Sequence, residues 1–220
     1  MEDLDGPRYG PASGGTPRRL VLLCHGLGAD GHDLIDLAPT WAAALPHAAF
    51  AAPDAPERYD GAPVGRQWFS IADRTPARLL AGVANAASAL NRFIDAELAR
   101  LALPADAYAL MGFSQGAMTV LYTGLRRAAP PRAVLAFSGA LIAPERLVEA
   151  IARPPVLLVH GEADEVVPVE RSRLAERALR DAGIEVEALY CPGLGHGIDE
   201  AGLSTGALFL QRAFAAEAGA

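Results

Sequence analysis

The residue types that nucleophilic acyl transfer requires occur in this chain in short glycine-rich strings. Ser114 is the central residue of Gly112-Phe113-Ser114-Gln115-Gly116, which follows an apolar run and precedes a helix-like run. A strand, a tight turn and a helix form the context in which a G-x-S-x-G string becomes a nucleophile elbow, with the serine hydroxyl raised above a sheet. Glycines two residues to either side let the strand and helix approach closely. The string therefore predicts that Ser114 is a nucleophile.

A serine hydroxyl needs a base to take its proton and a third group to orient that base. His196 lies in a glycine-rich loop and is the predicted base. Asp164 is the predicted acid because the Val-Val-Pro sequence just after it would fix its loop in place. Glu162 and Glu165 are interpreted as solvated loop charges. Asp199, close to His196, is the rival acid, which we interpret as a helix cap.

A second glycine string, Gly26-Leu27-Gly28-Ala29-Asp30-Gly31, follows an apolar strand-like run and allows two interpretations. It matches the dinucleotide-binding pattern G-x-G-x-x-G. However, that pattern also requires an Asp or Glu at the end of the next strand, about 20 residues after the glycines, and no acidic residue lies there. In the other interpretation, the N–H groups of Leu27 and Gln115 bind an oxyanion. His25, directly before the string, is expected to be structural.

Short aliphatic runs alternate with amphipathic stretches along the chain, which predicts an α/β fold with a mostly parallel sheet and helices on both faces. The expected strands are Leu20–His25, Ala48–Ala52, Ala107–Met111, Ala133–Phe137, Val156–His160 and Val186–Cys191. The expected helices are Gly31–Leu45, Pro76–Leu101, Gln115–Arg127, Pro144–Ala152, Pro168–Ala182 and Ile198–Ala216. The three candidate catalytic residues follow strands, and catalytic residues of such sheets lie beyond strand carboxyl ends. Residues 1–18 are expected to be a flexible tail, and residues 19–220 a single domain.

Composition excludes several classes of partner. The 220 residues carry a net charge of −7 with scattered basic residues, which argues against nucleic acid and anionic membranes. No apolar run reaches the roughly 18 residues of a membrane-spanning helix, so no stable membrane insertion is expected. The acidic, Pro/Gly-rich start is unlike a signal peptide, so we expect a cytoplasmic location. Cys24 and Cys191 are expected to be free and buried.

Taken together, these strings resemble the small carboxylesterase, lysophospholipase and acyl-protein thioesterase branch of the α/β-hydrolases. The resemblance extends from about Leu20 to the C-terminus and is carried by His25-Gly26-Leu27-Gly28, Ala52-Pro53-Asp54-Ala55-Pro56, Gln67-Trp68-Phe69-Ser70, Gly112-Phe113-Ser114-Gln115-Gly116, His160-Gly161-Glu162-Ala163-Asp164 with Val167-Pro168, and Gly195-His196. It implies a Ser114–His196–Asp164 triad, an oxyanion hole at Leu27 and Gln115, and an α/β-hydrolase fold. Ser70 departs from the pattern, because many relatives carry Asp there.

The loops indicate what kind of substrate such a site would take. About 17 residues, 138–154, separate two core strands, which leaves no room for a lid domain. The long segment 53–75 is expected to fold over the sheet. Five side chains are predicted to line an acyl groove: Trp68, Phe69, Ile71, Ile142 and Val167. For Trp68 the alternative is that it plugs the core beneath the loop.

The expected function is hydrolysis of carboxylic esters with short to medium acyl chains, with lysophospholipids among the candidate substrates, and without cofactor or metal. The alternative substrates are protein or small-molecule thioesters. A binding protein that keeps the hydrolase fold without catalysis is a further alternative, although the intact Ser, His and Asp argue against it. A homodimer that covers part of the apolar surface fits the composition.

Overall fold

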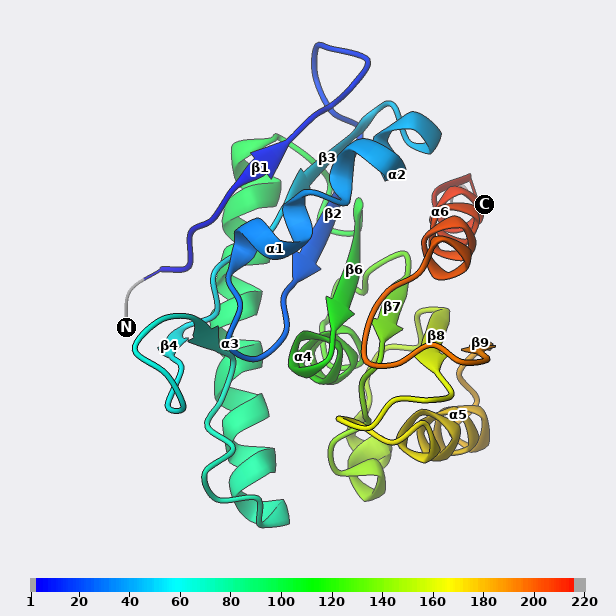
Figure 1. The fold of residues 1–220 in the computed structure, drawn as a ribbon. Helices are drawn as coiled ribbons and strands as arrows, with labels where there is room; N and C mark the ends of the chain where they lie inside the picture. Colours follow the sequence, from blue (N-terminus) through cyan, green and yellow to red (C-terminus); the bar gives the residue numbers. More distant parts are fainter. Residues whose placement is uncertain (1–2, 216–220) are drawn as a thin grey trace.

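A seven-stranded sheet with the strand order β1-β3-β2-β6-β7-β8-β9 runs through the described part of the chain, residues 3–215 of a computed structural model (Figure 1). The strands are β1 (Arg8–Tyr9), β2 (Arg19–Cys24), β3 (Ala48–Ala51), β4 (Glu57–Arg58), β5 (Arg66–Gln67), β6 (Tyr108–Phe113), β7 (Val134–Phe137), β8 (Val156–Gly161) and β9 (Val186–Cys191). The helices are α1 (Gly31–Ile35), α2 (Ala38–Ala44), α3 (Pro76–Arg100), α4 (Gln115–Gly124), the 3₁₀ helix η1 (Pro144–Glu149), α5 (Glu170–Asp181) and α6 (Glu200–Ala215).

The pairing of the strands confirms the mostly parallel sheet predicted from the sequence. All six predicted strands are present, and they pair in parallel from β3 to β9. β1 pairs antiparallel with β3 at one edge. The two-residue strands β4 and β5 form a separate antiparallel pair within the long segment 53–75. The carboxyl ends of the parallel strands therefore lie at a common edge, where the candidate site residues follow β6, β8 and β9.

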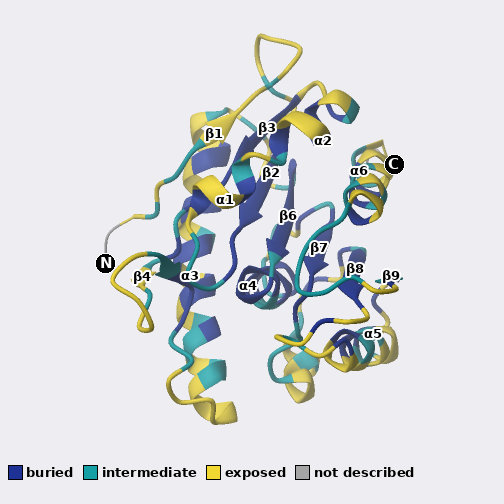
Figure 2. Ribbon diagram, in the orientation of Figure 1, coloured by how far each residue is buried: buried dark blue, intermediate teal, exposed yellow. Residues whose placement is uncertain are grey.

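Helices cover both faces of the sheet, and each face has its own apolar cluster. Alternate residues of each central strand point to opposite faces, so Leu22 joins the cluster with α3, α4 and α5, whereas Leu23 joins the cluster with α1, α2 and α6. The central strands β2, β3, β6, β7 and β8 are buried along almost their whole length (Figure 2). This double burial explains why the strands are continuous aliphatic runs in the sequence.

Two predicted helices differ from the structure. The stretch expected as one helix over Gly31–Leu45 forms two short helices, α1 and α2. Pro39 lies at the start of α2, where its ring and its missing N–H prevent a continuous helix. The stretch expected over Pro144–Ala152 is the 3₁₀ helix η1, and residues 138–154 contain no further helix or strand. That segment is therefore too small for a lid domain.

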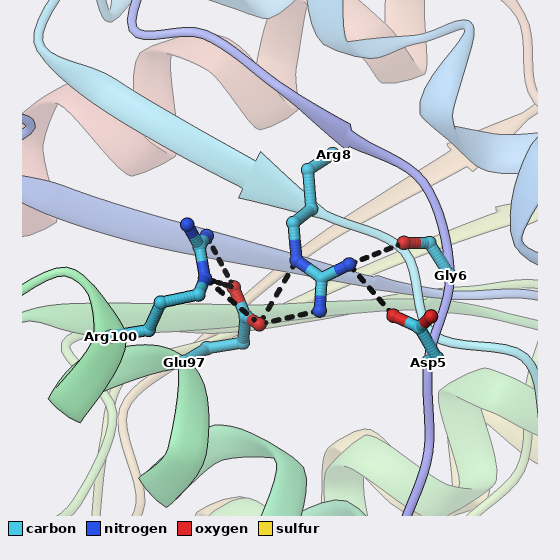
Figure 3. Close-up of polar contacts among 5 residues, drawn as sticks. All are labelled: Asp5, Gly6, Arg8, Glu97 and Arg100. Atoms are coloured by element: carbon cyan, nitrogen blue, oxygen red, sulfur yellow. Dashed lines mark hydrogen bonds and ion pairs between the residues drawn. The ribbon is translucent and has the colours of Figure 1, made fainter.

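Within the N-terminal segment expected to be a flexible tail, residues 5–9 pack along the domain. Arg8 of β1 donates to the Glu97 carboxylate of α3 from Nε (3.0 Å) and Nη2 (2.7 Å), and Arg100 pairs with the same group (Figure 3). Burial opposes ionisation of Glu97, but the hydrogen bonds from Arg8 and Arg100 outweigh it and lower the pKa of Glu97. The expectation missed this contact because its partners lie 89 positions apart.

Between residues 3 and 215, no helix combines the length and the apolar character that a membrane span needs.

Candidate active site

Ser114 lies at the junction of β6 and α4 in a strained backbone conformation. Its φ of 54° and ψ of −114° are rare for a residue with a side chain, and such strain is typical of a nucleophile elbow. The Ser114 N–H donates to the carbonyl of Phe137 on β7 (2.9 Å), which ties the turn to the neighbouring strand. The turn therefore holds the hydroxyl at the carboxyl edge of the sheet.

The two glycines of the elbow are required by close approaches of the backbone. A Cβ atom at Gly112 would lie 2.4 Å from the backbone of Gly116. A Cβ atom at Gly116 would lie 2.0 Å from the carbonyl oxygen of Cys24 at the end of β2. Both distances are far shorter than any van der Waals contact, so only glycine allows the elbow to pack against β2.

Three side chains predicted from the sequence form a continuous hydrogen-bonded chain. His196 Nδ1 lies 2.7 Å from Asp164 Oδ2, and His196 Nε2 lies 3.0 Å from Ser114 Oγ. The carboxylate accepts the proton of Nδ1, so Nε2 is free to accept the proton of the serine hydroxyl. The ring of His196 also packs against Phe113, with 4.8 Å between ring centroids. This arrangement can perform nucleophilic acyl transfer.

The carboxylate of Asp164 is buried and fully used by hydrogen bonds. Its Oδ1 accepts the N–H groups of Val166 and Val167, each at 2.9 Å. Burial opposes ionisation, but the hydrogen bonds from His196 and from these backbone groups outweigh it, so the pKa of Asp164 is lowered. Of the other carboxylates considered, Glu162 pairs with Arg173 at the surface. The sequence Val-Val-Pro after Asp164 thus supplies backbone donors to the acid.

A second buried histidine, His160 at the end of β8, contacts the acid. Its Nε2 lies 2.8 Å from the carbonyl of Val167 and 3.1 Å from Asp164 Oδ2, and its Nδ1 lies 2.6 Å from Ser172 Oγ. A carbonyl only accepts, so Nε2 carries a proton, and the Ser172 hydroxyl also lies within donating distance of the carbonyl of Gly139 (3.3 Å). Sequence reasoning assigned no role to this side chain. The only sequence signal for this contact is the spacing of four residues between His160, at the end of β8, and Asp164, in the loop that follows β8.

Asp199, the alternative acid, caps a helix. Its Oδ1 accepts the N–H of Gly202 in the first turn of α6 at 2.8 Å. The cap interpretation of Asp199 is therefore confirmed.

The loop after β2, which contains Leu27, lies beside the elbow, since a Cβ atom at Gly26 would lie 3.4 Å from the Cβ of Ser114. Among residues 3–215, the backbone N–H of Leu27 has no hydrogen-bond acceptor. His25 ties this loop to the start of segment 53–75 by two hydrogen bonds. Its Nε2 accepts from Ala55 N (3.0 Å), and its Nδ1 donates to Gly26 O (2.7 Å). Burial lowers the pKa of His25, which keeps the ring neutral in this role. His25 is structural, as expected.

The structure argues against a dinucleotide site at the same glycine string. A bound pyrophosphate would need the free N–H groups at the start of α1. Those of Gly31 and His32 already donate to carboxylates of Asp54 and Asp30, each at 2.9 Å. Two carboxylates at this helix terminus would repel a phosphate. Among residues 3–215, no group of three or more His, Cys, Asp or Glu side chains could hold a metal ion.

The side chains predicted to line an acyl groove divide into two sets. Trp68 and Phe69 are buried, each only 1% exposed, which favours the core-plug alternative for Trp68. Ile71 and Ile142 are partly exposed and pack against the cluster that α3, α4 and α5 share. Val167 is also partly exposed. Only the second set is accessible enough to touch a substrate directly.

Ser70, where many relatives carry Asp, has a carboxylate beside it nonetheless. Its hydroxyl donates to Asp60, which lies between β4 and β5. In this chain the hydroxyl of Ser70 and the carboxylate of Asp60 together form the polar contact at this point of the loop.

A comparison with protein families supports what the geometry indicates. A family model described as phospholipase/carboxylesterase matches residues 12–213. The chain belongs to this phospholipase/carboxylesterase family. It is therefore a serine hydrolase with the α/β-hydrolase fold.

Free, buried thiols at Cys24 and Cys191 agree with the sequence expectation.

Relatives of the chain include an esterase and an acyl-protein thioesterase. The chain is 31% identical over 183 residues to the esterase YpfH of Escherichia coli, covering 83% of this chain and 77% of that protein. It is 27% identical over 194 residues to acyl-protein thioesterase 1 of Neurospora crassa, covering 80% and 79%. Among solved structures, the crystal structure of esterase PE8 is similar, with a TM-score of 0.90, 42% identity, and coverage of 96% and 99%.

Proposed function

We propose that this serine hydrolase cleaves carboxylic esters with short to medium acyl chains, with Ser114 as nucleophile, His196 as base and Asp164 as the orienting acid. The observation that carries the proposal is the hydrogen-bonded chain from Ser114 Oγ through the imidazole to Asp164 Oδ2. The similarity to esterase YpfH and esterase PE8 supports an oxygen ester as substrate.

In this mechanism Ser114 Oγ attacks the acyl carbonyl carbon while His196 Nε2 takes the hydroxyl proton. The carbonyl oxygen becomes an oxyanion, which accepts hydrogen bonds from the N–H groups of Leu27 and Gln115. Asp164 stabilises the imidazolium, whose Nε2 proton then passes to the departing alkoxide. A water molecule attacks the acyl-serine by the same sequence of steps and releases the acid. Each proton that leaves a nucleophile returns to a leaving group, so no cofactor is needed.

A fluorophosphonate probe tests the nucleophile. We expect it to label the wild type and not Ser114→Ala, because the probe reacts with an activated serine hydroxyl. Equal labelling of both proteins would refute the assignment. Loss of labelling with retained ester binding in Ser114→Ala would still agree with it. A wild type that binds esters but neither reacts with the probe nor turns over would instead favour a non-catalytic binding protein.

The acyl group is proposed to lie against Ile71, Ile142 and Val167, the accessible apolar side chains of the predicted set. A panel of 4-nitrophenyl esters of increasing chain length tests this. Ile142→Ala should shift the preferred length, since it removes apolar contact area from the groove. Ile151→Ala is the matched control, because Ile151 is 69% exposed and outside the proposed groove. Identical profiles for the two variants would contradict the proposed groove.

A thioester is the second candidate substrate, favoured by the similarity to acyl-protein thioesterase 1. The same acyl groups attached through sulfur, with released thiol measured by a disulfide reagent, give a direct comparison of kcat/KM. A thioester kcat/KM more than tenfold above that of the matched oxygen ester would make the thioester the proposed substrate.

A cytoplasmic location and a homodimer are also proposed, the first because two free thiols suit a reducing compartment. Fractionation and light scattering measure the two properties.

A further inference from the structure

One short segment contacts both parts of the proposed oxyanion hole. This segment, Gly65–Phe69, which we call the brace, includes β5 and continues toward α3. On one side it lies against the loop that presents the Leu27 N–H, and on the other against Gln115 at the start of α4. Its bulky members, Trp68 and Phe69, are almost completely buried, so the brace is a packed part of the domain.

Three hydrogen bonds join the brace to the loop of Leu27. Gly28 N donates to Arg66 O and Arg66 N donates to Ala29 O, both at 2.8 Å. The indole Nε1 of Trp68 donates to the carbonyl of His25 at 2.9 Å. These bonds hold backbone groups on both sides of Leu27, so they fix the direction of its N–H.

Two more hydrogen bonds join the brace to the side chain of Gln115. Its Oε1 accepts the N–H of Trp68, and its Nε2 donates to the carbonyl of Phe69, each at 2.7 Å. One partner is a donor and the other an acceptor, so the orientation of the amide is determined. The side chain is buried, which makes the loss of either bond costly. The backbone N–H of the same residue is the second proposed oxyanion donor.

We propose that the brace is a positioning element that sets the distance between the two oxyanion donors, with the side chains of Trp68 and Gln115 as its two attachment points. The inference rests on the proposed oxyanion hole. A donor stabilises the oxyanion only when it lies about 2.7–3.1 Å from the place where the charge forms. Leu27 lies in the loop after β2 and Gln115 at the start of α4. The pairing of β2 with β6 places these segments side by side, and fixing the two N–H groups relative to each other takes a further connection. Trp68 provides it without touching substrate.

Trp68→Phe tests the proposal, because it removes the indole N–H while keeping an aromatic ring in the core. We expect kcat for a short 4-nitrophenyl ester to fall roughly 10- to 100-fold with KM within about twofold. This fall is smaller than the roughly 10²- to 10³-fold loss that follows removal of a whole oxyanion donor. A misplaced donor weakens the transition state more than it weakens the bound ester.

Trp41→Phe is a matched control. Trp41 is also completely buried, and its Nε1 donates to the carbonyl of Leu203 at 3.0 Å, on the opposite face of the sheet. The two variants lose the same atoms and a comparable hydrogen bond, so a general loss of stability would affect both. We expect kcat of Trp41→Phe to stay within about twofold of wild type. Equal losses of kcat in the two variants would overturn the proposal.

A transition-state analogue separates positioning from folding. A boronic acid forms a tetrahedral adduct on the serine, with an oxygen in the oxyanion position. Its inhibition constant should rise in Trp68→Phe by about the same factor as kcat falls, whereas KM does not follow. An unchanged inhibition constant would contradict a role in the oxyanion hole.

Gln115→Met provides a second variant if Trp68→Phe fails to fold. It keeps the backbone N–H and the approximate side-chain size but loses both bonds to the brace. The same fall in kcat and weaker boronic acid inhibition are expected, and wild-type values would refute the proposal. Failure of the proposed function itself is distinguishable, because wild type would then hydrolyse no ester at all.

Discussion

Replacement of Asp164 by Asn tests the catalytic chain most directly, because the geometry fixes how the amide must lie. In one orientation the amide oxygen accepts the N–H groups of Val166 and Val167, as Oδ1 does now at 2.9 Å. The NH₂ group then faces His196 Nδ1. In the flipped orientation the NH₂ group would face both backbone donors, leaving two buried N–H groups without acceptors. The first orientation turns the NH₂ group toward only one other donor, His160 Nε2 at 3.1 Å, which keeps the carbonyl of Val167 as its acceptor, so this orientation is favoured.

The consequence for the base follows from that orientation. An NH₂ group 2.7 Å from Nδ1 stabilises the tautomer of His196 that carries its proton on Nε2. That nitrogen then cannot take the proton of Ser114, whose oxygen lies 3.0 Å away. The cost of the wrong tautomer in a Ser-His-Asp triad is about 10⁴-fold in kcat, or roughly 5 kcal/mol of transition-state stabilisation.

The assay is kcat for a short 4-nitrophenyl ester near pH 7.5, with circular dichroism to confirm folding. At this pH the wild-type carboxylate is ionised, because the usual aspartate pKa of about 3.9 is lowered further here. Glu162→Gln is the control, since it neutralises a surface carboxylate of the same loop and should leave kcat within about twofold. A folded Asp164→Asn protein that retains more than a tenth of wild-type kcat would refute the reasoning.

Three further substitutions probe the elements around the triad. Gly116→Ala should reduce the rate of fluorophosphonate labelling at least roughly 100-fold, because the added Cβ would lie 2.0 Å from Cys24 O and displace the elbow; labelling within tenfold of wild type would contradict the required close approach. Glu97→Gln should lower the free energy of unfolding, measured in urea at pH 7, by about 2 kcal/mol by breaking the ion pair between the buried Glu97 carboxylate and the more exposed Arg8. The pKa of Glu97 is lowered in the folded state, so its contribution is present above the unfolded pKa of about 4.3 and is lost as pH falls through the folded pKa; a difference that persists at still lower pH would show that packing, not charge, is responsible. Asp199→Ala should cost about 1 kcal/mol through loss of a helix cap and leave kcat within about twofold; a large fall in kcat would make Asp199 part of the catalytic chain.

The sheet could be predicted from the sequence because its strands carry their signal locally. A strand buried on both faces is a run of aliphatic residues, and Val156–Gly161 is an example. β1 carries no such signal. Its two residues, Arg8 and Tyr9, are exposed, and the strand is held by pairing with β3 and by the distant Glu97. Contacts of this kind depend on the finished fold, so local patterns cannot reveal them.

The contact among Ser114, Asp164 and His196 could also be predicted, since each follows a strand of one parallel sheet. The topology alone brings loops after such strands to a common edge. The lining of the proposed acyl groove is harder to predict, because apolar side chains line pockets and fill cores alike. Trp68 shows the ambiguity. An indole side chain suits either a groove or a core, and only its burial in the folded chain distinguishes the two.

Gln115 shows why a catalytic motif can be read from sequence while the precision of its site cannot. Its place directly after the nucleophile gives its backbone N–H a position that any residue would share, so that role follows from the motif. Its side chain binds backbone atoms of Trp68 and Phe69, more than 40 positions earlier. Every residue other than proline has the same backbone N–H and C=O groups, so the sequence contains no residue pattern that indicates these two contacts. The fourth position of the elbow string is therefore constrained in this fold by the brace, and a search for the string alone would treat it as free.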